Sequence, residues 1–242
     1  MSHVTTRRHV FGLMATTTLM ATVPFTRVAY ADDVMNARHV IDKSAITVER
    51  VRQGQKTTDA MDDFLRRSRG VLVIPNYYKA GFILGGSYGD GVLLKRQSEA
   101  SFGDPAFYRM TAGSLGLQAG MDISEIVFMI LTDKGLEAVL NDEFKIGANV
   151  GISVGSFGAG AEAATTTNAG NDIVAYSLSA GLFAGASFEG AVIKPRKDWN
   201  ASVYGVNNDE PRVIVERNQL QAAQTLKDSL AKNVYPVQPQ LN

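Results

Sequence analysis

The sequence contains no cysteine and only three histidines, His3, His9 and His39, among its 242 residues. Without cysteine the chain has no disulfide framework, no thiol nucleophile and no thiolate metal site. The three histidines do not have the spacing of a histidine-rich metal site. The formal net charge is zero, because 24 Lys and Arg residues balance 24 Asp and Glu residues. A protein without a basic excess is not a general nucleic-acid binder.

The amino terminus carries an apolar run, residues 10–23, that is too short and too rich in threonine to span a bilayer stably. Arg7 and Arg8 precede the run, and Ala29-Tyr30-Ala31 follows it with the small-x-small pattern of a cleavage site. We therefore expect residues 1–31 to be a bacterial export signal, read by the twin-arginine or the general secretory route. Its removal would leave 21 basic and 24 acidic residues, a net charge of −3, on a periplasmic or envelope-associated protein.

Residues 70–95 carry dense strand and turn signals. Val71–Ile74 is predicted to be a strand that ends at Pro75, because proline cannot donate to a β ladder. A second strand is expected over Ala80–Gly86 and a return strand over Val92–Lys95. The glycines of Tyr88–Gly91 permit the positive φ angles of a tight reversal between them.

Several separated motifs, found in the right order, resemble the SYLF domain family. They are Lys79-Ala80-Gly81-Phe82, Gly85-Gly86-Ser87-Tyr88-Gly89-Asp90-Gly91, Thr111-Ala112-Gly113-Ser114-Leu115-Gly116, Gly181-Leu182-Phe183-Ala184-Gly185 and Glu189-Gly190-Ala191. The resemblance implies a small β-barrel with helices packed on it. It also implies weak binding of anionic lipids, best known for phosphoinositides, and eukaryotic relatives that contact actin-linked machinery.

Strand signals continue beyond residue 95. Residues 144–155 and 176–188 alternate apolar and small or polar residues with a period of two, which predicts two long strands with Ile152 and Phe188 on their core faces. Ile126–Leu131 is continuously apolar, as in a strand buried on both faces. Small residues within long strands permit the coiling that barrel closure requires, and closure removes unpaired edges.

Helices are expected on both sides of the strands. Residues 32–53 place apolar side chains at steps of three and four, and Thr57 or Thr58 begins a second helix. Thr132 and Asp133 begin a short helix that ends near Leu140. The predicted fold is α+β and mainly β: a small antiparallel β-barrel core with three or four helices on its surface. The predicted single domain covers residues 32–235, with helices at 33–68, the barrel at 70–194, a helix at 217–232 and a frayed tail at 236–242.

Two serine motifs resemble a hydrolase nucleophile elbow, Gly85-Gly86-Ser87-Tyr88-Gly89 and Gly151-Ile152-Ser153-Val154-Gly155. That elbow needs a helix after the serine and a downstream histidine, and neither serine has them. Gly158-Ala159-Gly160-Ala161-Glu162-Ala163 fits a loose dinucleotide fingerprint but lacks the strand–turn–helix setting that gives the fingerprint meaning. The acidic residues Asp59, Asp62 and Asp63 are more typical of a solvated first helical turn than of a metal site. We predict no enzymatic activity, no cofactor and no metal.

The predicted function is peripheral binding of anionic phospholipid, with phosphoinositide-type headgroups implied by the resemblance, at the cell envelope. The alternative is an envelope structural or protein-interaction module with a protein partner and no specific lipid. Tyrosine rings and basic side chains suit the headgroup zone of a membrane. We therefore expect a lipid site on one rim of the barrel, formed by Arg66, Arg67, Arg69, Tyr77, Tyr78 and Lys79.

Overall fold

The computed structural model describes residues 25–54, 58–81, 84–115, 120–147, 150–156, 171–179 and 190–232. Its α-helices are α1 (Phe25–Gly54), α2 (Thr58–Arg67), α3 (Asp133–Leu140), α5 (Lys197–Tyr204), α6 (Pro211–Ile214) and α7 (Gln224–Ala231), with a 3-10 turn, η1 (Gln221–Ala223), before α7. Its strands are β1 (Gly70–Gly81), β2 (Leu84–Ser98), β3 (Ser101–Phe102), β4 (Ala106–Leu115), β5 (Gly120–Ile130), β6 (Phe144–Lys145), β7 (Ile152–Ser156), β8 (Ile173–Ser179) and β9 (Val192–Pro195).

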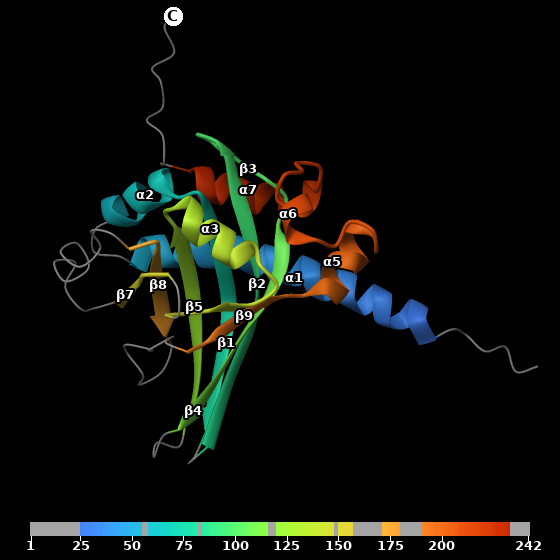
Figure 1. The fold of residues 1–242 in the computed structure, drawn as a ribbon, viewed down its shortest axis with the longest axis horizontal. Helices are drawn as coiled ribbons and strands as arrows, with labels where there is room; N and C mark the ends of the chain where they lie inside the picture. Colours follow the sequence, from blue (N-terminus) through green and yellow to red (C-terminus); the bar gives the residue numbers. More distant parts are fainter. Residues whose placement is uncertain are drawn as a thin grey trace, which may run out of the picture.

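The strands form one curled sheet in the order β6-β9-β4-β2-β1-β5-β8-β7, with β3 paired to β2 (Figure 1). The pairing is antiparallel except between β7 and β8, which run parallel. This half-barrel confirms the predicted α+β fold class. Six α-helices pack around it in the described part of the chain, where three or four were expected.

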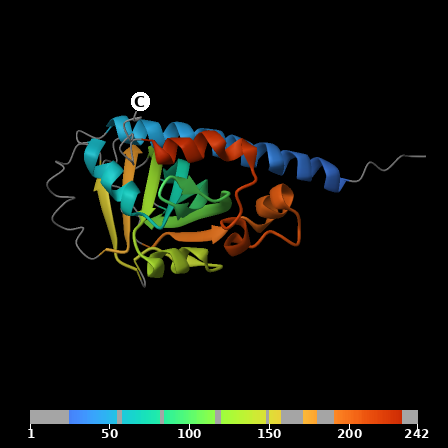
Figure 2. The same ribbon diagram turned by 90° about the horizontal axis from the view of Figure 1, so that it is seen from above.

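Where helices cover the sheet, both of its faces are buried, which explains why the covered parts of its central strands are almost continuously apolar. Val71 and Val73 of β1 pack on one face against α1, α2 and α7. Leu72 and Ile74, on the alternate phase, pack on the other face against α3 and the end of α6. Figure 2 shows α1 and α7 side by side along one side of the sheet, with α3 on the opposite side.

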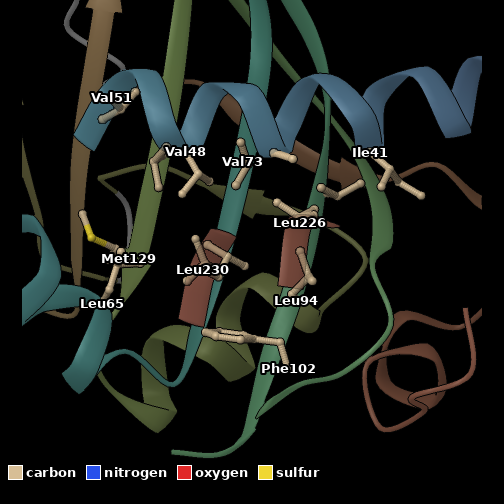
Figure 3. Close-up of a cluster of buried hydrophobic side chains, with 14 of the residues drawn as sticks. Ile41, Val48, Val51, Leu65, Val73, Leu94, Phe102, Met129, Leu226 and Leu230 are labelled. Atoms are coloured by element: carbon tan, nitrogen blue, oxygen red, sulfur yellow. The ribbon is translucent and has the colours of Figure 1, made fainter. Parts of the chain in front are cut away.

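The helix-covered core on the α1 side joins segments far apart in the sequence (Figure 3). Ile41 and Val48 of α1 and Leu226 and Leu230 of α7 point toward Val73 and Leu94 of the sheet, and all six are 3% exposed or less. Burial of such a side chain contributes about 1.5–3 kcal/mol. This apolar contact therefore fixes α1 across the strands.

The expected end of the first strand at Pro75 is wrong, because β1 continues to Gly81. Pairing of β1 with β2 shifts register between Val73 and Tyr78, and pairing with β5 shifts between Ile74 and Tyr77. This is a β-bulge, a feature that tolerates proline within a strand. The bulge, rather than a chain reversal, accommodates the proline.

The expected reversal at Tyr88–Gly91 is also wrong, since these residues lie within β2 and pair with β4. Gly89 and Gly91 serve a different purpose there. A Cβ added to Gly89 would lie 2.5 Å from Asn76 O, and one added to Gly91 would lie 2.2 Å from Val73 O. The two glycines allow the bulged part of β1 to approach β2.

The predicted strand over residues 144–155 is broken in the structure. β6 ends at Lys145, Gly147 follows with φ of 84°, and β7 begins only at Ile152. A positive φ interrupts an extended strand, so alternation alone overestimated its length. Of the second predicted strand, β8 covers residues up to Ser179, and Phe188 lies outside the described residues.

The helix predictions succeed where local caps and periodicity define the ends. Residues 32–53 lie within α1, which begins at Phe25 and therefore includes the predicted cleavage motif. Thr132 caps α3 as expected, accepting a hydrogen bond from the Gly135 N–H. The predicted helix at 217–232 begins later, with η1 and then α7. Within the described residues, no helix combines the length and apolar character needed to cross a membrane.

Candidate functional site

A groove of about 480 Å³ lies between α1, the sheet and the start of α5. Figure 1 shows α1 crossing the strands while β1, β2, β4 and β5 continue past it on one side. The groove is lined by Asp33, Asn36, His39, Val40, Lys43, Asn76, Tyr78, Tyr88, Asp90, Arg109, Arg196 and Trp199. Its volume lies within the range of small-ligand and peptide-side-chain pockets.

One wall of the groove is a single stripe of α1. Asp33, Asn36, Val40 and Lys43 recur at steps of three and four, which places them on the same side of a helix. The Lys43 ammonium donates to the Asn76 side-chain oxygen over 3.2 Å when the amide is oriented so that its nitrogen donates to the Pro75 carbonyl. The helix wall is thereby joined to the β1 bulge.

The floor of the groove is a charge network centred on Asp90. Arg109 donates to both Asp90 carboxylate oxygens, from Nε and from Nη2, each over 2.7 Å. Arg196 donates from Nη1 to Asp90 Oδ1 over 2.9 Å. Two guanidinium groups therefore occupy both oxygens of one carboxylate, and paired charges of this kind are held in a fixed geometry.

Arg196 also connects the floor to α5. Its guanidinium lies 4.1 Å from the centre of the Trp199 ring and donates to Asp198 over 2.6 Å. Burial lowers the Arg196 pKa, but hydrogen bonding with Asp198 and the charge of Asp90 outweigh that effect and raise it. The hydrogen bond from Arg196 lowers the pKa of Asp198. Both groups are thus charged at neutral pH.

Four side chains form an exposed row on the sheet beside α1, which we call the tyrosine ledge: Ile123, Tyr78, Tyr88 and Thr111. Tyr78 pairs directly with Ile123 of β5 and with Tyr88 of β2, and Tyr88 pairs with Thr111 of β4. Directly paired residues share one face of a sheet. Tyr78 and Tyr88 are 38% and 52% exposed, and their ring centroids lie 5.5 Å apart. At a strand spacing of about 4.8 Å, the ledge is roughly 14 Å long.

The structure does not bring the six predicted lipid-site residues together. Arg66 and Arg67 lie at the end of α2, and Arg69 directly precedes β1. Tyr78 and Lys79 lie at the other end of β1. Nine residues of β1 lie between Arg69 and Lys79, a span of roughly 30 Å.

The arginines of the predicted site form exposed ion pairs. Arg66 and Arg67 both contact Asp63, over 3.2 and 3.0 Å, and Arg69 contacts Asp133 over 3.4 Å. All three arginine side chains remain at least 43% exposed. Exposed pairs of this kind are weak, so the charges stay accessible to a ligand.

Tyr77 differs from its neighbour Tyr78, because it is buried on the opposite face of the sheet. Its hydroxyl lies 2.7 Å from the Ser87 hydroxyl, and burial raises the Tyr77 pKa. Tyr77 therefore lies outside the surface that was expected to meet lipid.

Ser87 of the first serine motif is buried within β2 and has a hydroxyl neighbour, Tyr77, in place of a general base. His39, the histidine in the described part of the chain, lines the groove on the α1 side. Ser87 and Tyr77 face the other side of the sheet, so the sheet separates the serine from the histidine. Among the described residues, no cluster of three or more His, Asp or Glu side chains is placed to hold a metal ion.

Sequence reasoning missed most of the groove. Asp90 and Arg109 are 19 residues apart, and Asp90 and Arg196 are 106 apart, so no local spacing connects them. Helix α5 was not predicted, and with it Arg196 and Trp199 were overlooked. The available signal was the Gly-Asp-Gly sequence around Asp90, which indicates a strand segment that another backbone approaches closely.

Sequence comparison finds relatives in fungi and animals. The chain is 35% identical to LAS seventeen-binding protein 3 of Saccharomyces cerevisiae over 150 residues, which are 60% of this chain and 32% of the yeast protein. It is 32% identical to Protein YSC84 of the same yeast over 158 residues, 63% of this chain and 33% of that protein. It is 26% identical to human SH3 domain-containing YSC84-like protein 1 over 141 residues, 58% of this chain and 41% of the human protein.

The chain spans about a third of the length of the yeast relatives that it matches. No solved structure matches it. The family described as "Ysc84: Las17-binding protein actin regulator" matches residues 111–233. This is the family that the SYLF motifs indicated, and the chain belongs to it.

Proposed function

We propose that the chain is a non-enzymatic binding module whose groove beside α1 receives a segment of a protein partner. The observation that carries the proposal is the exposed Tyr78–Tyr88 pair beside a rigid charged floor. Exposed aromatic rings in a preformed groove are typical of recognition surfaces. The Asp90 network holds the floor before a partner arrives, so less ordering is required on binding.

The names of the relatives support a binding role. LAS seventeen-binding protein 3 is named for a protein that it binds, and the family description names an actin regulator. These names describe binding or regulatory proteins rather than enzymes. From these names we infer only that this chain also acts by binding a protein.

Site-specific photo-crosslinking in the native cell tests the proposal. A photoreactive residue at position 88 should crosslink to a protein partner, whereas the same residue at position 213 should not. Val213 is 46% exposed on α6, which packs on the opposite face of the sheet. The purified partner should then bind the wild-type chain and bind Lys43→Glu with Tyr88→Ala much more weakly. Equal crosslinking at both positions, or unchanged binding by the double variant, would overturn the proposal.

A second candidate function is peripheral binding of anionic phospholipid at the bacterial envelope, with phosphoinositide-type headgroups as the class that the family resemblance implies. The observation that favours it is the group of three exposed arginines, Arg66, Arg67 and Arg69, within four residues. A basic residue near an anionic surface contributes about 1 kcal/mol. Three of them support weak, reversible attachment that salt would screen.

Liposome flotation tests this candidate. Arg66→Glu with Arg67→Glu should abolish flotation of residues 32–242 with anionic liposomes and leave the melting temperature nearly unchanged. The matched control is Lys194→Glu with Arg212→Glu, two exposed residues with the same change in charge. If the first variant floats as well as the control, the arginines do not hold the chain on the membrane.

A further inference from the structure

The hydrogen-bonding capacity of the groove narrows the chemistry of its partner. Both oxygens of Asp90 already accept hydrogen bonds from Arg109 and Arg196, so this carboxylate has little capacity left for a ligand. Several donors remain on the lining: the second Arg109 amino group, the Lys43 ammonium, and the Asn36 amide and the two tyrosine hydroxyls, which can also accept. The Asp33 carboxylate, at one end of the α1 wall, can only accept. The groove therefore suits a ligand that presents acceptors.

The charge of the lining does not favour a strongly anionic ligand. Lys43, Arg109 and Arg196 carry positive charge, and Asp33 and Asp90 carry negative charge. Asp198, outside the lining, pairs with Arg196 and offsets the remaining positive charge. A nearly neutral lining is better matched by neutral acceptors, such as peptide carbonyl groups, than by a cluster of phosphates.

The tyrosine ledge supplies the apolar part of the site. Ile123, Tyr78 and Tyr88 are 42%, 38% and 52% exposed. Next to them the sheet is open at Gly86 and Gly113, where an added Cβ would meet nothing within 4 Å. An elongated segment can therefore lie along the ledge beside α1.

The backbone conformation of the partner segment decides whether it can bind along the ledge. All carbonyl groups of a helix except the last four are bonded within the helix, which leaves few to accept from the groove donors. A β-strand pairs with a sheet edge, whereas the ledge lies on the face of the sheet and crosses β5, β1, β2 and β4. A polyproline II segment leaves its carbonyl groups free, and proline has no N–H that needs an acceptor. Four or five of its residues, at about 3.1 Å each, would span the ledge.

We propose that the groove binds a proline-rich segment of the partner in the polyproline II conformation, with proline rings on Tyr78 and Tyr88 and carbonyl groups accepting from the groove donors. This inference rests on the proposed function of the groove as a protein-binding site. Residues on both sides contribute to it: the ledge supplies the apolar contact, and Lys43, Asn36 and Arg109 supply the donors.

The test uses a fluorescein-labelled decaproline peptide and the full chain. Trp199 is the one tryptophan of the sequence and lines the groove, so its fluorescence reports occupancy independently of the label. Decaproline should raise the label's anisotropy and change the Trp199 emission with the same dissociation constant. A Gly/Ser peptide of equal length should do neither.

Variants separate the two parts of the site. Tyr78→Ala with Tyr88→Ala should weaken decaproline binding about tenfold or more, because it removes both rings. Tyr78→Phe with Tyr88→Phe keeps both rings and loses the two hydroxyl donors. This variant should therefore bind decaproline more tightly than the double alanine variant and more weakly than the wild type. Val213→Ala, on the opposite side of the sheet, should bind like the wild type, and circular dichroism should show all variants folded.

Three outcomes would overturn the inference: no decaproline binding, equal binding of the Gly/Ser peptide, or unchanged binding by the double alanine variant. The double alanine variant can also be tested for binding to anionic vesicles. If it binds vesicles more weakly than the wild type but binds decaproline equally well, the groove serves a membrane surface instead. Crosslinking of a protein at position 88 without decaproline binding would leave the proposed function standing and reject the proline-rich segment alone.

Discussion

At the residue scale, the glycines of this chain have different physical roles that one sequence motif conceals. Gly86 and Gly91 both belong to the Gly85–Gly91 motif. The space around Gly86 is open, whereas Gly91 lies against the backbone of the β1 bulge. The bulge in turn carries Asn76 to the groove wall, where it contacts Lys43. The close approach at Gly91 therefore supports the site as well as the fold.

Substitution at these two glycines gives a matched pair. In Gly91→Ala the new Cβ would lie 2.2 Å from Val73 O and 2.4 Å from Ile74 Cδ1, so the bulge must move. We expect a loss of about 3 kcal/mol or more in the free energy of unfolding. Gly86→Ala should change it by about 0.5 kcal/mol or less. Urea denaturation measures both free energies of unfolding. Similar losses in the two variants would contradict the close contact between Gly91 and the β1 bulge.

At the element scale, α7 is attached to the sheet by one buried carboxylate in addition to its apolar face. Asp104 is 1% exposed and accepts from Lys227 Nζ over 2.7 Å. It also accepts from the backbone N–H groups of Gln219 and Leu220. These bonds hold the chain in a non-helical turn, which explains why the carboxy-terminal helix starts later than the pattern of residues 217–232 predicts.

Removal of this carboxylate should release α7. Asp104→Ala leaves the Lys227 ammonium buried without its counter-charge, and should cost about 3–5 kcal/mol. The rate of amide hydrogen exchange should increase most in residues 224–231, which form α7. Lys194→Ala breaks a pair with Glu143 in which both side chains are 56% exposed, and should cost about 1 kcal/mol or less. Equal costs, or exchange gains spread evenly over the sheet, would contradict the anchoring role of Asp104.

At the scale of the whole molecule, the half-barrel has two distinct ends. Arg66, Arg67 and Arg69 lie at one end of β1, and Tyr78 lies toward the other beside the groove. The two proposed functions therefore use opposite ends of β1, the protein segment in the groove and the membrane at the arginine end. Salt should weaken the arginine contact more than the groove contact, because exposed charges are screened over about 8 Å.

Processing of the amino terminus also concerns the whole molecule. We expect mature protein from the native cell to begin at Asp32 or within a few residues of it, since Ala29-Tyr30-Ala31 follows an apolar run. Cleavage there would shorten α1 from its start at Phe25 and remove the hydrogen bond from the Tyr30 hydroxyl to the Ala201 carbonyl. The groove wall, which begins at Asp33, would stay intact. Mass spectrometry that finds Met1 intact in the mature pool would reject both export and the envelope location.

Local sequence alone determined the family, the α+β class and several elements. The Thr132 cap and the apolar stripe of residues 32–53 correctly predicted α3 and most of α1, because caps and helical periodicity depend on neighbours within four residues. Ile126–Leu131 identified β5 through its composition. The family motifs were visible for the same reason, since each is a short contiguous run.

Only the tertiary structure decided where the functional groups meet. The bulge at Pro75 shifts the register of β1, and that shift places Tyr78 beside Tyr88 on the exposed α1 side while Tyr77 is buried on the other side. Register between strands depends on contacts across the sheet, and a one-residue shift reverses the face of each side chain that follows. The same holds for Asp90, whose partners Arg109 and Arg196 arrive from β4 and from the start of α5. Contacts between residues so far apart in the chain leave no local pattern, so the groove became visible only when the strands were paired.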